Sequence, residues 1–284
     1  MIKVEQLRYT YRKQSAPAID NISFEIDKGE IFGFLGPSGA GKSTTQKVLI
    51  RLLKGFHGQV EVLNRKLETW DQNYYNHIGV GFELPNHYLK LTAIENLNFF
   101  ASFYDKPLRN PLELLRSVGL EAAAQQRVAE FSKGMKMRLN FVRALMHQPE
   151  ILFFDEPTTG LDPGNARIIK NIILGLKQQG KTIFITTHSM QDAEELCDRV
   201  AFIVDGKIAS IEAPRELKLQ YGQRIVKVEY LDHILRQKEL ELDGLGENPE
   251  FLQLIREKNI QTIHTEEASL EDVFIQITGK RLSS

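Results

Sequence analysis

The chain has 284 residues, 42% hydrophobic and 26% charged, a composition typical of a globular protein with one large domain and an appendage. The formal net charge of -1 excludes a strongly basic field, so no nucleic-acid partner is expected. The single cysteine, Cys197, excludes an intrachain disulfide framework and suits a reducing compartment. We expect no secretory leader and no membrane helix of about 18 apolar residues. A role at a membrane would therefore require a membrane-embedded partner.

Buried strands alternate with helices in the first 222 residues, which predicts an α/β fold whose sheet is covered on both faces. The Leu-, Ala- and Glu-rich stretch 86–148 is predicted to be a helical subdomain inserted into this core. Residues 223–284 are charge-rich and predict a small C-terminal α+β extension, which ends in a helix. In chain order we expect strands at 22–26 and 31–35, a helix over 42–53, strands at 59–63 and 78–82, helices near 94–104, 112–118 and 133–146, a strand at 151–154, a helix over 163–179, a strand at 182–187 and a hairpin of 200–204 with 207–211.

A glycine-rich loop follows the strand expected at 31–35 and opens the next helix. Residues 36–43 match G-x-x-x-x-G-K-[ST], the phosphate-binding P-loop, in the strand–loop–helix context that this pattern requires. Glycines let main-chain N–H groups point at phosphate oxygens, and the helix N-terminus adds partial positive charge. Lys42 is predicted to reach the β- and γ-phosphates of ATP, and Ser43 to ligate Mg²⁺. The predicted nucleotide-binding residues of this loop are Gly36, Pro37, Ser38, Gly39, Ala40, Gly41, Lys42, Ser43 and Thr44.

Two carboxylates follow the strand expected at 151–154. The carboxyl ends of parallel strands meet at the edge where α/β folds bind ligands, so Asp155 and Glu156 are expected beside the phosphate loop. Asp155 would hold Mg²⁺, directly or through water, and Glu156 would act as the general base that activates a water molecule. The two motifs together predict ATP hydrolysis.

Residues 1 to about 222 resemble the ATP-binding subunit of an ABC transporter, because further motifs follow in the order of that family. Residues 131–135 resemble its signature, residues 158–162 its D-loop, and Thr186-Thr187-His188 the segment with its switch histidine. The resemblance implies a P-loop NTPase of the ABC ATPase type, with a mixed sheet core. It also implies that His188 contacts the γ-phosphate and the attacking water, and that Tyr11 stacks on adenine, with Tyr9 as a nearby rival.

The resemblance further implies a catalytic site shared between two subunits. Ser132, Gly134 and Asp162 of one subunit would meet the ATP bound by a second copy or a homologous cassette. Two departures from the family pattern stand out. The signature keeps Ser132 and Gly134 of Leu-Ser-Gly-Gly-Gln but changes its other positions, and a working site is expected. Glu83 replaces the glutamine of the Q-loop, where a carboxylate could accept from Mg²⁺-bound water but adds negative charge near the phosphates.

By this resemblance the chain is expected to be a subunit that dimerises on MgATP and drives an integral membrane permease, peripherally on the cytoplasmic face of the plasma membrane. The tail at 270–279 is similar to that of exporters with a separate permease chain, so we expect export of a drug, peptide, lipid or polysaccharide. A non-transport ABC ATPase in a soluble complex is the alternative. The aromatic residues of 88–104 are expected either to dock the permease or to pack within their own subdomain. The tail beyond 222 is either a packing appendage or a sensor.

Overall fold

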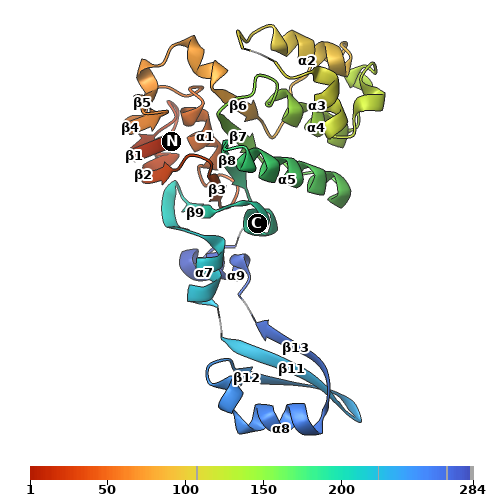
Figure 1. The fold of residues 1–284 in the computed structure, drawn as a ribbon. Helices are drawn as coiled ribbons and strands as arrows, with labels where there is room; N and C mark the ends of the chain where they lie inside the picture. Colours follow the sequence, from red (N-terminus) through yellow and green to blue (C-terminus); the bar gives the residue numbers. More distant parts are fainter. Residues whose placement is uncertain (107, 223, 267, 282–284) are drawn as a thin grey trace. The chain divides into compact units, whose positions relative to one another are not determined.

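The computed structural model describes residues 1–106, 108–222, 224–266 and 268–281, and these divide into two compact units, 1–212 and 213–281 (Figure 1). The division falls ten residues before the expected boundary at 222. The reason is that the helix α7 (Pro214–Tyr221) packs against the last helix, α9 (Leu270–Thr278), within the second unit. None of the helices in the described residues has the length and apolarity needed to cross a membrane.

A mixed sheet lies at the centre of the first unit. Its strands are β3 (Ile31–Leu35), β6 (Ile78–Gly81), β7 (Ile151–Asp155), β8 (Thr182–Thr187), β9 (Arg199–Val204) and β10 (Lys207–Glu212). The strand order is β10-β9-β3-β8-β7-β6, and neighbours run parallel except β10, which pairs antiparallel with β9. β3 and β8 are buried along their whole length, as their uninterrupted apolar runs predict. The carboxyl ends of β3, β7 and β8 therefore meet at one edge.

A second, antiparallel sheet has the order β2-β1-β4-β5, formed by β1 (Ile2–Tyr9), β2 (Ile19–Ile26), β4 (His57–Val62) and β5 (Arg65–Lys66). The strand β1 was not predicted from the sequence, because a register shift between Val4 and Leu7 breaks its alternation of buried and exposed residues. Gln6, between them, has a φ of 51°. The bulge turns Leu7 back into the core, where it is fully buried.

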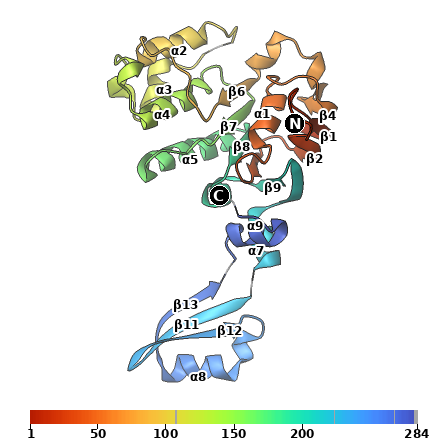
Figure 2. The ribbon, with the colours of Figure 1, turned by 180° about the vertical axis from the view of Figure 1, so that it is seen from behind.

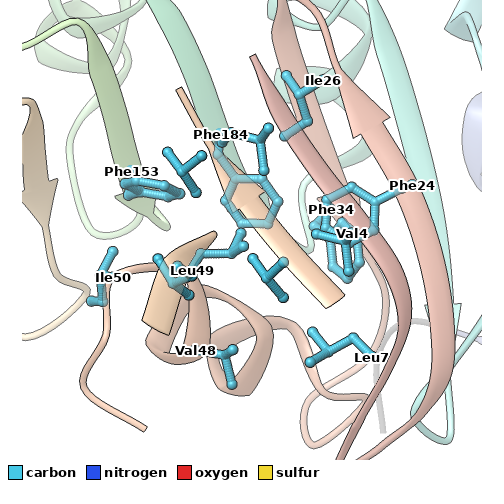
Figure 3. Close-up of a cluster of buried hydrophobic side chains, with 14 of the residues drawn as sticks. Val4, Leu7, Phe24, Ile26, Phe34, Val48, Leu49, Ile50, Phe153 and Phe184 are labelled. Atoms are coloured by element: carbon cyan, nitrogen blue, oxygen red, sulfur yellow. The ribbon is translucent and has the colours of Figure 1, made fainter. Parts of the chain in front are cut away.

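A hydrophobic core fills the space between the two sheets and α1 (Lys42–Leu49) (Figure 3). The ring centroid of Phe34 in β3 lies 5.3 Å from that of Phe24 in β2 and 5.4 Å from that of Phe184 in β8. Val48 and Leu49 bury the inner face of α1 in the same cluster. Because α1 begins at the phosphate loop, this packing also fixes where the loop lies.

Helices α2 (Ala93–Ala101), α3 (Pro111–Ser117) and α4 (Lys133–Arg143) lie between β6 and β7 in the chain and gather in one group (Figures 1 and 2). Each begins at a side-chain cap: Thr92 with Glu95 forms a capping box, and Asn110 and Ser132 accept from main-chain N–H groups. The remaining helices of the first unit are α5 (Pro163–Gln178) and α6 (Met190–Leu196), and short 3₁₀ turns occupy Leu67–Thr69, Gln72–Asn76, Glu121–Ala123 and Val128–Glu130.

The hairpin expected at 200–211 is confirmed as β9 and β10, joined through Asp205 and Gly206 with φ of 49° and 76°. Positive φ at both positions is the turn that an Asp-Gly pair favours.

The second unit is an antiparallel sheet with one helix packed on it, beside the α7–α9 pair. The sheet order is β12-β11-β13, from β11 (Ile225–Asp232), β12 (Ile234–Glu241) and β13 (Asn259–Glu266), and the helix is α8 (Pro249–Glu257), preceded by a 3₁₀ turn at Leu245–Glu247. Val226, Val228 and Leu240 form its core with Leu254 of α8. The packed final helix predicted from its spacing is confirmed in α9, where Leu270, Val273 and Phe274 are buried.

Candidate functional site

The phosphate loop leaves β3 at Gly36 and enters α1 at Lys42. A methyl group on Gly36 would lie 2.1 Å from the carbonyl oxygen of Ile203, so only glycine fits there. Gly41 has a φ of 111°, and a Cβ there would lie 2.7 Å from the carbonyl oxygen of Ala18. Gly36 and Gly41 thus let the loop pass close to neighbouring main chain.

Lys42 brings a buried positive charge to this loop. It is 8% exposed, and its ammonium donates to the carbonyl oxygens of Gly36 at 2.5 Å and Pro37 at 3.0 Å. Burial lowers the pKa of Lys42 below its ordinary value, while the nearby carboxylates of Glu156, Asp155 and Glu83 act in the opposite direction. Among the described residues no carboxylate pairs directly with this ammonium, so a phosphate fits the position.

Asp155 ends β7 and faces the start of α1. Its Oδ1 accepts a hydrogen bond from Ser43 Oγ at 3.4 Å and another from the hydroxyl of Thr186, in the neighbouring strand β8. A hydroxyl and a carboxylate this close are oxygen ligands of the kind that Mg²⁺ takes. Within the described residues, no group of three or more His, Cys, Asp or Glu could hold a metal. A metal here would therefore depend on nucleotide oxygens and water for its other ligands.

Glu156 is 6% exposed and has a φ of 51°, so the chain turns sharply there out of β7. Its Oε1 accepts from His188, through the main-chain N–H at 3.0 Å and ring Nδ1 at 2.7 Å. Its Oε2 accepts from the hydroxyls of Thr159 at 3.0 Å and Thr187 at 3.1 Å. Because a carboxylate can only accept, the proton of the His188 ring lies on Nδ1 in this arrangement. The carboxylate is thus held in one orientation from two sides.

A cavity of about 290 Å³ brings these groups together. It is lined by Ser38, Gly39, Gly41, Lys42, Ser43, Thr44, Glu83, Asp155, Glu156 and His188, all predicted from the sequence. Tyr11 lies beside the loop, since its hydroxyl is 3.2 Å from Thr44 Oγ1. The rings of Tyr9 and Tyr11 pack edge to face, with centroids 5.0 Å apart.

Ser132, Gly134 and Asp162 do not line this cavity. Ser132 Oγ caps α4 by accepting from Met135 N–H at 3.2 Å, and Asp162 caps α5 by accepting from Asn165 N–H at 3.0 Å. A Cβ on Gly134 would meet the Leu161 side chain at 3.5 Å, so the two helix starts are neighbours. In one chain these residues have structural roles, and a role toward nucleotide would require a second chain.

Three hydroxyl residues that orient the carboxylates were given no role by the sequence: Thr159, Thr186 and Thr187. The signal is present in hindsight, because Thr186 and Thr187 end a fully buried strand whose preceding three residues are apolar. Buried hydroxyls need acceptors, and the adjacent strand end supplies two carboxylates.

Comparison with known proteins agrees with this geometry. The family described as "ABC transporter" matches residues 19–159, and "Fluoroquinolone efflux ABC transporter C-terminal domain" matches residues 224–267. A fluoroquinolones export ATP-binding protein of Mycobacterium tuberculosis is 52% identical over 285 residues, covering 100% of this chain and 95% of that protein. A bacitracin transport ATP-binding protein of Bacillus licheniformis is 33% identical over 98% of this chain and 97% of its own length.

Among solved structures, a dimeric ATP-binding cassette in a post-hydrolysis state with ADP and Pi is similar. The TM-score is 0.69 at 28% identity, and the match covers 75% of this chain and 98% of that chain. The phosphate loop, the acidic strand end and His188 thus occur in a chain that matches curated ATP-binding transport proteins over 98% or more of its length. The chain therefore belongs to the ABC transporter family, as one of its ATP-binding, ATP-hydrolysing subunits.

Proposed function

We propose that this chain, as a dimer on MgATP, powers a membrane permease that exports drugs, with fluoroquinolones as the first class to test. One observation carries the ATPase part: Lys42, Asp155, Glu156 and His188 line a single cavity beside the phosphate loop. The export part is supported by the 52% identity to a fluoroquinolones export ATP-binding protein, which extends through the C-terminal unit.

In this proposal the main-chain N–H groups of the loop and Lys42 bind the β- and γ-phosphates. Ser43 and Asp155 would hold Mg²⁺, which supplies charge neutralisation at the phosphates. Glu156 takes a proton from the attacking water, and its Oε1 is held toward the site by His188. With its proton on Nδ1, the His188 ring, on a side chain that is 58% exposed, leaves Nε2 as an acceptor that could receive a hydrogen bond from the attacking water.

The shared site is part of the proposal. Ser132, Gly134 and Asp162 would complete it across the dimer, because the N-terminus of α4 carries a partial positive charge suited to a phosphate of the other subunit. ATP would then hold two subunits together, and hydrolysis would release them.

An aromatic cluster on the helical group is the proposed contact with the permease, from the cytoplasmic side of the plasma membrane. Tyr88, Phe99 and Phe103 are 50%, 38% and 65% exposed, and the Phe99 ring centroid lies 4.7 Å from that of Tyr88 and 5.2 Å from that of Phe103. Tyr104 instead stacks inward on His147 at 3.8 Å. Self-packing, one of the two expectations for this segment, is thus seen for Tyr104, whereas docking to the permease stays a proposal for the exposed aromatic residues. An exposed aromatic patch suits an amphipathic helix of the permease.

The test is drug accumulation in cells that produce the chain together with its permease. We expect lower fluoroquinolone accumulation with the native chain than with Glu156→Gln, at equal amounts of both subunits. Equal accumulation with the two chains, while the purified complex hydrolyses ATP, would refute fluoroquinolone export. A double variant, Phe99→Ser with Phe103→Ser, should lose co-purification with the permease from detergent. Leu52→Ser, at an exposed apolar residue away from the cluster, is the control and should retain it.

A further inference from the structure

A largely covered ion pair links α5, α6 and the segment that follows Glu156. Lys170 Nζ in α5 lies 2.6 Å from Asp192 Oδ1 in α6, and the two side chains are only 13% and 14% exposed. The hydroxyl of Thr158 donates to the other oxygen of Asp192. Asp192 sits in the first turn of α6, where its N–H donates to the capping Ser189 Oγ at 3.2 Å. One carboxylate therefore joins three segments of the chain.

The Asp192 carboxylate has the partners that a charge with little exposure to water needs. A buried carboxylate is costly unless it is paired and fully hydrogen-bonded, and Asp192 has both a cation and a hydroxyl donor. Burial by itself lowers the pKa of Lys170, but hydrogen bonds to Asp192 and to Glu195, the latter at 2.8 Å, outweigh it and raise that pKa. Lys170 thus stays charged, and its ion pair with Asp192 holds α5 and α6 together.

The segments joined by this pair are the two that hold the Glu156 carboxylate. Thr158 immediately precedes Thr159, which donates to Glu156 Oε2. Ser189, the cap of α6, follows Thr187 and His188, which donate to Oε2 and Oε1. The Ser189 N–H also donates to Thr187 Oγ1 at 3.0 Å. A shift of α6 relative to the 157–162 segment would therefore rotate the carboxylate.

We propose that Lys170, Asp192 and Thr158 are positioning residues that keep the two flanks of Glu156 in register and so aim its carboxylate at the attacking water. None of the three lines the nucleotide cavity, so they act through Glu156 and not on the phosphates. The inference rests on the proposed role of Glu156 as the general base.

The test compares turnover with nucleotide binding in the full-length chain assembled with its permease. Thr158→Val keeps the shape of the side chain but removes the hydroxyl, and Thr158→Ser restores it. We expect kcat to fall roughly ten- to a hundredfold in Thr158→Val and Lys170→Met, because small misplacements of a catalytic group have costs of this size. KM for ATP should change less than about twofold, since the phosphate loop is untouched. Thr158→Ser should recover most of the turnover.

The matched control is Lys177→Met. Lys177 lies on the same helix, α5, and pairs with Asp198 just after α6. This ion pair therefore links nearly the same elements as the pair of Lys170 with Asp192, but within the described residues it has no contact with those that bind Glu156. Its kcat should stay close to that of the native chain. If Lys170→Met does not fold, the Thr158 variants decide the question. An equal fall of kcat in Lys177→Met and Thr158→Val would overturn the positioning role, and so would native turnover in Thr158→Val.

A double variant separates this role from general loss of structure. In the Glu156→Gln background, Thr158→Val should cause no further loss in single-turnover rate, because its effect passes through the missing carboxylate. An additive loss contradicts the inference. Native turnover in Glu156→Gln alone would instead remove the base assignment on which the inference rests, so the two failures can be told apart.

Discussion

Replacing Glu156 by glutamine separates the chemical role of the carboxylate from its structural role. The native carboxylate accepts four hydrogen bonds, two at each oxygen. A glutamine oxygen in the place of Oε1 keeps both bonds from His188. Its NH₂ group in the place of Oε2 meets the hydroxyls of Thr159 and Thr187, which can rotate and accept. The side chain thus stays in place but can no longer take a proton.

The magnitudes follow from this geometry. Exchanging charge-assisted bonds for neutral ones weakens them, but removing a charge that is 6% exposed offsets part of the loss. We expect the free energy of unfolding to change by no more than about 2 kcal/mol, since neutral hydrogen bonds contribute on the order of 1 kcal/mol each. Loss of a general base lowers kcat by about 10²- to 10⁴-fold. That corresponds to roughly 2.7–5.4 kcal/mol in the activation barrier.

The assay measures phosphate release at saturating MgATP, together with thermal unfolding and the binding of a fluorescent ATP analogue. Glu156→Gln should bind nucleotide like the native chain and turn over at least a hundredfold more slowly. Glu156→Ala is the structural comparison, because it strands the buried hydroxyl donor of Thr187 and removes the acceptor of the part-buried His188 N–H. It should unfold at a clearly lower temperature, since each unsatisfied buried group costs about 1–3 kcal/mol. Turnover of Glu156→Gln within tenfold of native would refute the base role.

Four further predictions concern other parts of the chain. Gly36→Ala should abolish measurable ATP binding in a titration while the chain still folds, because the new methyl would lie 2.1 Å from the Ile203 carbonyl oxygen and would displace the loop. Retained ATP affinity would contradict the idea that only glycine fits at this position. Gly175→Ala, in α5 with nothing within 4 Å of the new methyl, should stabilise the chain by about 0.5–1 kcal/mol in urea unfolding. Glu83→Gln should require less Mg²⁺ for half-maximal ATPase rate, because it removes a negative charge from the cavity; superimposable Mg²⁺ titrations would disprove this. Burial lowers the pKa of His147 from 6.5 to about 4. The folded state then binds fewer protons than the unfolded state between these values, so stability should fall as pH falls through that window, by up to about 1.4 kcal/mol per pH unit. Unfolding of His147→Phe at several pH values should show a flatter dependence.

The nucleotide cavity was predictable because its residues lie in short local motifs. The P-loop needs glycines, a lysine and a hydroxyl at fixed spacing, and the acidic pair needs only the end of an apolar strand. The register of parallel strands then brings Ser43, Asp155 and His188 to one edge. The sequence also determined the α/β fold class. Its uninterrupted apolar runs do not alternate with polar residues as half-buried strands do, and they are too short for buried helices, so they indicate fully buried strands.

Only the tertiary structure showed which side chains hold the residues of those motifs in their orientations. Thr187 and Thr159 meet at Glu156 from segments separated along the chain, and Asp192 joins Lys170 to Thr158. Apart from the two threonines that end β8, no local pattern marks such contacts, because side chains on different elements meet through packing and not through spacing. The sequence also did not predict β1, because its bulge interrupts the alternation of buried and exposed residues. Nor did it predict that α7 belongs to the second unit, because its packing partner α9 follows about fifty residues later. Local motifs thus predict which groups do the chemistry, whereas long-range packing decides how firmly and in what orientation those groups are held.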